Sequence, residues 1–246
     1  MRRRWRFLVC GPGPGAWHMA LDEALAELCG QGASPPTLRT FVFEGRCLSL
    51  GRLQPASPLA QRAEALGIGT VRRPTGGGAV LHAGDICYAV VAPLDDPAVG
   101  GPLRRSYCQM ALALVRALES LGVTSPRVCE ATARAARAEA CFASSSAFEV
   151  TAGGAKLVGS AQLRRRGALL QQGSLRTVAD HALEVSLFGS SLGPSLAELL
   201  GRVPSLAEVA EALRRGFAEV LGLELEPGSL LPHEEALARA RLAAAA

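Results

Sequence analysis

The residue of this chain best suited to chemistry is its single lysine. Of the 26 Lys and Arg residues in the 246-residue sequence, only Lys156 is a lysine, and it lies in a glycine-rich run. A compositional bias toward arginine explains the missing lysines but not the retained one. A lysine ammonium is a compact charge whose pKa shifts on desolvation, whereas a guanidinium is planar and stays charged. We therefore predict a chemical role for Lys156, against the alternative of a leftover surface cation.

Cys141 precedes Lys156 by 15 residues and is a candidate nucleophile. A turn between the two segments can bring the side chains together, and a nearby ammonium favours the thiolate form of a cysteine. A thiolate can carry a covalent intermediate. Taken alone, Cys141 is better explained as a buried thiol, because free cysteines are among the most buried residues. Only the pairing with Lys156 favours the nucleophile.

A second candidate site is the run Arg72–His82, which reads RRPTGGGAVLH. Three consecutive glycines let a backbone approach a ligand closely and present amides in a concave nest. Arg72 or Arg73 could add a charged donor, and His82 a polar contact. The alternative is a glycine-rich hairpin with exposed arginines. The run lacks Gly-Lys-Ser/Thr, so it is not a P-loop.

A dinucleotide-binding turn is suggested by the spacing of Gly11, Gly13 and Ala16. Pro12 and Pro14 remove amides that such a turn would offer, and no parallel βαβ unit is expected to follow. We reject this interpretation.

The basic turn Arg164–Arg166 either binds phosphates or an acidic partner, or is a solvated hairpin tip; both interpretations stay open. His18, His181 and His233 are isolated, which argues against a metal site. Seven cysteines without Cys-x-x-Cys spacing argue against a disulfide framework and structural zinc.

The composition argues against a nucleic-acid-binding protein and against a membrane protein. The formal net charge of +4 is mild, and neither a basic stripe nor interleaved aromatic residues indicate nucleic-acid binding. The apolar stretch after the basic start is too short for a signal peptide, and no segment approaches the length of a membrane span. We expect a soluble, cytoplasmic protein without a membrane partner.

Apolar patterning and turn signals predict strands in the first 175 residues and helices after them. Strands are expected at residues 5–10, 37–44, 47–50, 70–73 and 86–91, with a hairpin turn at 44–46 and a three-strand meander over 148–175 that turns at 152–155 and 164–167. Helices are expected at residues 17–29, 58–67 and 103–121, after capping boxes at Ser195 and Ser205, and from Pro232. Residues 127–146 are ambiguous between helix and loop. This order favours an α+β domain with a mixed, largely antiparallel sheet flanked by helices. We expect one domain over 1–246, with a sheet-rich core at about 5–185 and a helical part at 190–246.

Four runs resemble the biotin/lipoate A/B protein ligase family: MALDEA at 19–24, LSLGR at 48–52, the run at 72–82, and KLVGSAQ at 156–162. The resemblance extends from about Trp5 to the end. Within the family, residues 140–142, 170–175 and 216–222 are similar to octanoyltransferases of the LipM type. The glycine and lysine motifs together are specific, whereas either one alone would be weak.

The resemblance implies an α/β catalytic domain related to class II synthetases and biotin ligases. It implies that Cys141 takes octanoyl from octanoyl-acyl carrier protein and passes it to a lysine of a lipoyl domain or of glycine cleavage H protein, without a cofactor or a metal. Lys156 would lower the pKa of the thiol and hold the acyl carbonyl oxygen. The implied acyl-binding residues are Arg73, Thr75, Gly76, Gly77, Gly78, Ala79, Val80, Leu81, His82, Gly159, Ser160 and Ala161.

Two departures from the family pattern bear on acceptor choice and rate: Ala83 replaces an Asp, and Gln172 replaces a His. The main alternative function is an ATP-dependent lipoate ligase, which shares both motifs but needs no cysteine. An amidotransferase that moves octanoyl from H protein, and a non-catalytic acyl- or biotin-binding regulator, also stay open. Acyl chain length, natural acceptor and oligomeric state are not determined by the sequence.

Overall fold

The computed structural model describes residues 3–55, 58–129, 141–143 and 148–244. Most of residues 127–146, which the sequence leaves ambiguous, lies outside this range. The described ends of that segment form a short strand, β7 (Arg127–Val128), and one 3-10 turn, η1 (Cys141–Ala143). None of the described helices is both long and apolar enough to cross a membrane.

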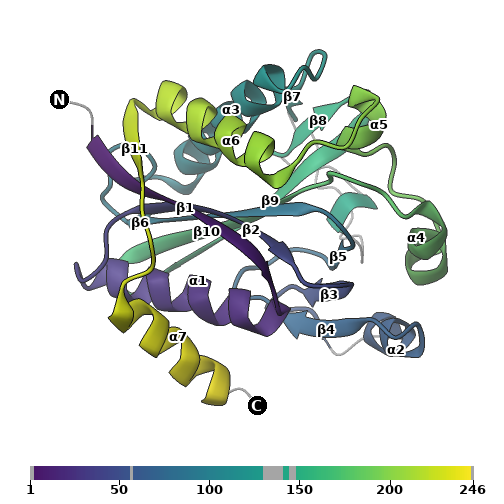
Figure 1. Cartoon of the computed structure of the whole chain (residues 1–246), viewed down its shortest axis with the longest axis horizontal. Coiled ribbons are helices and arrows are strands. Elements are labelled where there is room, and N and C mark those ends of the chain that lie inside the picture. Colours follow the sequence, from purple (N-terminus) through teal and green to yellow (C-terminus); the bar gives the residue numbers. More distant parts are fainter. Residues whose placement is uncertain (1–2, 56–57, 130–140, 144–147, 245–246) are drawn as a thin grey trace.

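The core of the fold is an eight-stranded sheet with mixed strand directions (Figure 1). Its order is β11 (Leu223–Pro227), β1 (Arg3–Gly13), β2 (Thr37–Phe43), β6 (Ile86–Pro93), β10 (Ala168–Leu175), β9 (Ala155–Arg165), β8 (Val150–Ala152) and β7. The β11–β1 and β1–β2 pairs are parallel, and the other pairs are antiparallel. The expected mixed and largely antiparallel sheet is confirmed.

Helices cover both faces of this sheet. Helices α3 (Leu103–Ser120) and α6 (Leu206–Leu221) pack together on one face, and α1 (Gly15–Gly30) and α7 (Pro232–Ala244) pack together on the other (Figure 1). Two separate apolar clusters fill the spaces between the helices and the sheet. A buried layer on each face explains why β6, in the middle, is buried along nearly its whole length.

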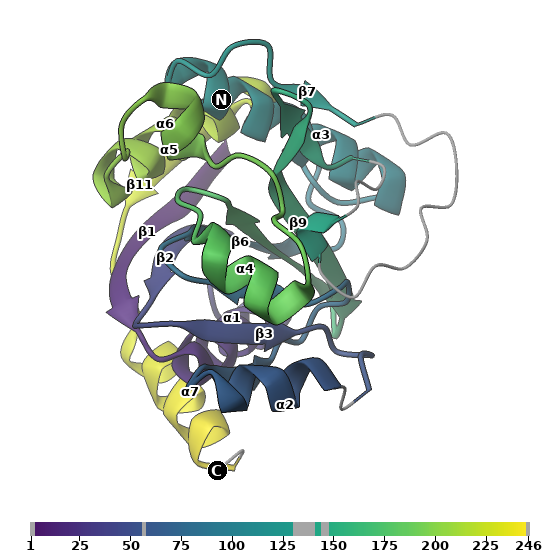
Figure 2. The same ribbon diagram turned by 90° about the vertical axis from the view of Figure 1, so that its right-hand side faces the viewer.

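A second, three-stranded sheet lies at one side of the fold. Its order is β4 (Gly69–Arg72), β3 (Cys47–Leu50) and β5 (Val80–His82). Helices α2 (Pro58–Ala65) and α4 (His181–Phe188) pack against it through a third apolar cluster (Figure 2). This small sheet carries the glycine run.

Local signals predicted most elements. The turns of the 148–175 meander fall at residues 153–154 and 166–167, and both capping boxes form, at the start of α5 (Leu196–Leu200) and of α6. The helices expected at 17–29, 58–67, 103–121 and from Pro232 are all present.

Long-range pairing produced the errors. The hairpin expected at 44–46 is wrong, because β2 joins the large sheet and β3 the small one. The helical part expected at 190–246 contains strand β11, which pairs with β1, and helix α4 was not expected. The statement that no parallel βαβ unit follows Gly11 and Gly13 is also wrong, because β1, α1 and β2 form one. Both glycines lie in β1 rather than in a phosphate-binding turn.

Helix α6 crosses α3 at a glycine. A Cβ added at Gly216 would lie 2.4 Å from the Ala113 carbonyl oxygen and 2.8 Å from the Ala117 backbone nitrogen. Backbone atoms of a packed helix cannot move aside cheaply, so the two helices approach this closely only because residue 216 lacks a side chain.

We expect Gly216→Ala to lower the free energy of unfolding by about 1–3 kcal/mol, although alanine is the better helix former by about 1 kcal/mol. Urea denaturation followed by circular dichroism would measure this change. Gly11→Ala is the matched control, because a Cβ at Gly11 meets no atom within 4 Å. An equal effect of the two substitutions would contradict the packing argument.

Candidate functional site

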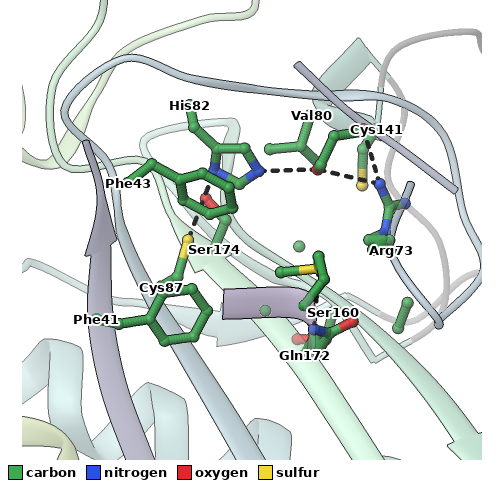
Figure 3. A pocket seen from close by; sticks show the side chains of 15 residues that line it. Phe41, Phe43, Arg73, Val80, His82, Cys87, Cys141, Ser160, Gln172 and Ser174 are labelled. Atoms are coloured by element: carbon green, nitrogen blue, oxygen red, sulfur yellow. Dashed lines mark hydrogen bonds between the residues drawn. The ribbon is translucent and has the colours of Figure 1, made fainter. Parts of the chain in front are cut away.

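A pocket with an empty volume of about 400 Å³ opens where the two sheets meet η1. Phe41 and Phe43 lie on one side of the pocket and Cys141 and Arg73 on the opposite side (Figure 3), and Met19 also belongs to the lining. The pocket therefore presents an apolar wall opposite the sulfur.

The Cys141 and Lys156 side chains meet at this pocket. The distance from Lys156 Nζ to Cys141 Sγ is 3.2 Å. The Cys141 backbone N–H donates to the Ala79 carbonyl oxygen at 2.8 Å, which ties η1 to the end of the glycine run. The two side chains that the sequence analysis paired are thus in contact, with Cys141 in the pocket lining and Lys156 behind it.

The Lys156 ammonium is buried and its three N–H donors all have acceptors. Besides the sulfur, Nζ donates to the Cys141 carbonyl oxygen at 2.6 Å and to Glu149 Oε1 at 2.5 Å. It also lies 5.2 Å from the centre of the Phe142 ring. Glu149 thus supplies the opposite charge beside the buried ammonium, and an ammonium next to a sulfur favours the thiolate form.

A β-bulge orients Lys156. Strand β8 pairs Thr151 with Lys156 but Val150 with Val158, so Leu157 is the extra residue. Bulges redirect neighbouring side chains. Lys156 therefore reaches over Gly159, where an added Cβ would lie 3.0 Å from Lys156 Cε and 3.1 Å from Cys141 Sγ. The pair fits because residue 159 is a glycine.

The other cysteines near the pocket have different surroundings. Burial and the Asp85 charge raise the pKa of the Cys87 thiol well above its ordinary value, and the same two causes raise the pKa of Cys47 to about 11. Both remain protonated near neutral pH. Cys141 is partly exposed and is the cysteine beside the chain's one lysine.

The glycine run is held from behind by Arg73. The guanidinium makes five hydrogen bonds, to the carbonyl oxygens of Gly76, Gly78 and Ser49 and to Ser49 Oγ. Since a guanidinium has five N–H donors, all of them are engaged within the protein. Arg73 thus contributes its charge to the pocket wall. Its N–H groups donate to the protein's own loop and strand, and not to a ligand as the sequence had suggested. The neighbouring Arg72 donates to the Gly51 and Gln54 carbonyl oxygens instead.

Gln172, one of the two departures from the family pattern, connects the glycine run to helix α1. Thr75 Oγ1 donates to Gln172 Oε1 at 2.9 Å, and Gln172 Nε2 donates to Asp22 Oδ2 at 2.7 Å. Asp22 in turn pairs with the buried Arg39 of β2. Ala83, the other departure, lies at a separate cavity beside Arg176.

His82 is hydrogen-bonded on both ring nitrogens. Nδ1 lies 2.8 Å from Asp85 Oδ2, and Nε2 lies 2.8 Å from Ser49 Oγ. The ring stacks on Phe43 with centroids 3.8 Å apart. Asp85 also accepts from the Ser174 hydroxyl and from the Cys87 thiol.

The predicted residues divide into two groups. Those that line the pocket are Arg73, Val80, His82, Cys141, Gly159, Ser160 and Ala161. Thr75, Gly76, Gly77, Gly78, Ala79 and Leu81 form the supporting loop and strand, and Lys156 lies behind Cys141. The sequence analysis missed Met19, Phe41, Phe43, Ser49, Cys87, Gly173 and Ser174 in the lining, and Glu149 and Asp85 behind it. Phe41 and Phe43 alternate in a strand, a signal that could have indicated a shared face.

A possible metal cluster was also missed. Potential ligand atoms of His82, Asp85 and Cys87 lie within 4.8 Å of one another. The hydrogen bonds among these three side chains, and the proton that the Cys87 thiol retains, account for their proximity.

The basic turn is largely engaged within the protein. Arg166 pairs with Glu27 of α1 at 2.6 Å, and Arg164 donates to the Gln162 side chain and the Gly101 carbonyl oxygen. These contacts favour a structural role for two of its three arginines.

The fold and this site define a protein class. Residues 14–218 match the lipoyl protein ligase A/B catalytic domain, and the chain belongs to this family. The resemblance stated from its motifs is confirmed.

Individual relatives lie in the branch that the motifs indicated. The chain is 37% identical to the octanoyltransferase LipM of Kyrpidia tusciae, over 97% of this chain and 95% of that protein. It is 36% identical to the octanoyltransferase LipM of Symbiobacterium thermophilum, over 96% and 93%. Among solved structures, the putative lipoate protein ligase Ta0514 of T. acidophilum with bound lipoic acid has a TM-score of 0.79 at 27% identity, over 96% of this chain and 94% of that one.

We expect Gly159→Ala to force Cys141 and Lys156 apart and to slow alkylation of Cys141 by iodoacetamide at neutral pH by about tenfold, because the rate follows the thiolate fraction. Peptide mapping by mass spectrometry would report Cys141 separately from the other cysteines. Gly69→Ala is the matched control, since a Cβ there meets no atom within 4 Å. An unchanged rate in Gly159→Ala would show that the close approach does not activate the thiol.

Proposed function

We propose that this protein is an octanoyltransferase that carries the acyl group on Cys141. The observation that carries the proposal is the 3.2 Å contact between Lys156 Nζ and Cys141 Sγ at the wall of an apolar pocket. The names of the relatives support the same activity. A sulfur nucleophile suits this chemistry because it accepts an acyl group from one thioester and releases it to an amine.

The donor in this proposal is octanoyl-acyl carrier protein. The Cys141 thiolate attacks the thioester carbonyl carbon, a new C–S bond forms, and the old C–S bond breaks. The carrier's thiol leaves as a thiolate and takes a proton from solvent. Once Sγ is acylated, the Lys156 N–H that pointed at the sulfur can donate to the carbonyl oxygen and stabilise the developing negative charge.

The acyl chain extends from Cys141 across the pocket toward Phe41 and Phe43, in a lining that also includes Met19. Burial of each CH₂ against these side chains contributes about 0.8 kcal/mol. Gly159, Ser160 and Ala161 form the neighbouring wall, and the braced glycine run closes it from the other sheet.

The acceptor in this proposal is a lysine amine on a lipoyl domain or on glycine cleavage H protein. It attacks acyl-Cys141, an amide bond forms, and the cysteine leaves as a thiolate beside Lys156. The route uses no nucleotide, cofactor or metal. We propose a cytoplasmic location, because cysteines such as Cys141 stay reduced there.

The strongest rival is an ATP-dependent lipoate ligase, since the fold also matches a lipoate ligase structure. A ligase activates the acid as an adenylate and needs no nucleophilic cysteine. The buried Lys156, with its donors on Cys141 and Glu149, favours the transferase.

We expect wild-type protein incubated with octanoyl-acyl carrier protein to gain one octanoyl group, and Cys141→Ala to gain none. Intact-mass measurement after rapid acid quench would show the adduct. Cys108→Ala, which removes a partly exposed cysteine on α3, should label like wild type. An octanoyl adduct on Cys141→Ala would assign the nucleophile elsewhere, and a wild type that binds without labelling would favour the regulator.

We expect modification of a lipoyl domain with octanoyl-acyl carrier protein alone, and none with free octanoate or lipoate plus ATP and magnesium. Mass spectrometry of the acceptor would distinguish the two routes. Modification that requires ATP and free acid would instead establish the ligase. Octanoylated H protein, offered as donor in place of the carrier protein, tests the amidotransferase alternative.

A further inference from the structure

The second half-reaction needs a group that accepts a proton. A lysine amine that attacks acyl-Cys141 must lose a proton as the C–N bond forms, or the amide cannot result. Lys156 cannot take this proton as it stands, because its ammonium carries three N–H donors directed at Cys141 Sγ, the Cys141 carbonyl oxygen and Glu149. A different group in the pocket wall is therefore needed if the protein itself accepts this proton.

Ser49, His82 and Asp85 have the geometry of a Ser–His–Asp triad, which is recognised by its contacts rather than by sequence order. The serine hydroxyl lies 2.8 Å from His82 Nε2, and His82 Nδ1 lies 2.8 Å from Asp85 Oδ2. Ser49 and His82 line the pocket, whereas Asp85 lies behind them.

The neighbouring side chains determine the direction of the Ser49 hydroxyl proton and which nitrogen of His82 carries a proton. An Arg73 N–H points at Ser49 Oγ from 3.3 Å, so the serine's own proton is directed to His82 Nε2. His82 Nδ1 then carries the N–H that donates to Asp85. Burial alone would raise the pKa of Asp85, but the charge of His82 and the hydrogen bonds from His82, Ser174 and Cys87 lower it. Asp85 is thus a carboxylate that accepts from the His82 ring and fixes its orientation.

The triad lies next to the acylated cysteine. Ser49 of β3 pairs with Val80 of β5, so their side chains share a face, and both line the pocket. The residue before Val80, Ala79, accepts the hydrogen bond from the Cys141 backbone N–H. Arg73 contacts Ser49 Oγ, and Arg73 and Cys141 both line the pocket. Figure 3 shows His82, Arg73 and Cys141 around the same end of the pocket.

We propose that Ser49, His82 and Asp85 form a relay that removes the proton from the acceptor amine during its attack on acyl-Cys141. The inference rests on the proposed octanoyltransferase function and adds the group that accepts the proton. Ser49 contacts the amine, His82 takes the proton that Ser49 passes on, and Asp85 positions His82.

The step balances as follows. The neutral amine forms a C–N bond to the acyl carbon, and the C–S bond to Cys141 breaks. One amine proton moves to Ser49 Oγ while the Ser49 proton moves to His82 Nε2. Cys141 leaves as a thiolate beside Lys156, and the His82 imidazolium, paired with Asp85, returns its proton to solvent after the amide departs.

The test separates the two half-reactions. Each variant is first mixed with octanoyl-acyl carrier protein, and loading of Cys141 is followed by quench and intact mass. Loaded protein is then mixed with a lipoyl domain, and loss of the adduct is followed the same way. We expect Ser49→Ala and His82→Gln to load within about twofold of wild type but to transfer at least about 10²-fold more slowly, the usual effect of removing general-base catalysis. Asp85→Asn should likewise slow transfer more than loading.

A second acceptor separates proton transfer from damage to the pocket. The nitrogen of hydroxylamine is less basic than a lysine amine, so it loses its proton during the attack without the help of a general base. Hydroxylamine should therefore discharge the loaded variants at close to the wild-type rate. Ser34→Ala is the matched control, because Ser34 is buried like Ser49 but is not among the residues that line the pocket. It should load and transfer like wild type.

Two results would overturn the relay: transfer to the lipoyl domain at the wild-type rate in Ser49→Ala and His82→Gln, or loading and transfer slowed in parallel. Failure of the wild type itself to load would instead refute the octanoyltransferase proposal, and the relay with it. Normal loading with normal transfer in the variants would refute the relay alone.

Discussion

The site depends on the burial of one ammonium. Moving an unpaired charge out of water costs several kcal/mol, so a buried lysine persists only where its donors have partners. Glu149 supplies the opposite charge to Lys156, and the carbonyl oxygen and sulfur of Cys141 take the remaining donors. The same contacts hold η1 against the pocket, so the groups that pair the buried ammonium also position the sulfur beside it.

The glycine run contributes to this site as a braced wall. Arg73 donates to the loop's carbonyl oxygens. The loop also packs closely on Gly51, where an added Cβ would lie 2.0 Å from the Gly77 oxygen. Gln172 links the loop's Thr75 to α1. These contacts pack two sheets closely enough that Ser49 and His82 of the small sheet and Cys141 share one pocket with the phenylalanines of β2. Rigid support of this kind keeps reacting groups in place.

Sequence reasoning succeeded where structure is decided locally and failed where it is decided by pairing. The turn at Gly153 and Gly154 was predictable because both residues adopt positive φ, and the capping boxes because each bonds within four residues. The bend at Gly45 also forms, yet its flanking strands join different sheets, which no local signal distinguishes from a hairpin. Strand β11 alternates Leu and Glu and could have been recognised by its period of two.

By itself, the sequence determined which groups are available for chemistry: one lysine, a cysteine fifteen residues earlier and a run of three glycines, together with the family these motifs indicate. The tertiary structure decided what they contact. A regular strand would place residues 156 and 159 on opposite faces, and the bulge at Leu157 brings Lys156 over Gly159 and onto Cys141. The tertiary structure also makes Glu149 the partner of Lys156 and Asp85 the partner of His82. Register and side-chain direction depend on long-range packing, which is why spacing alone could not show them.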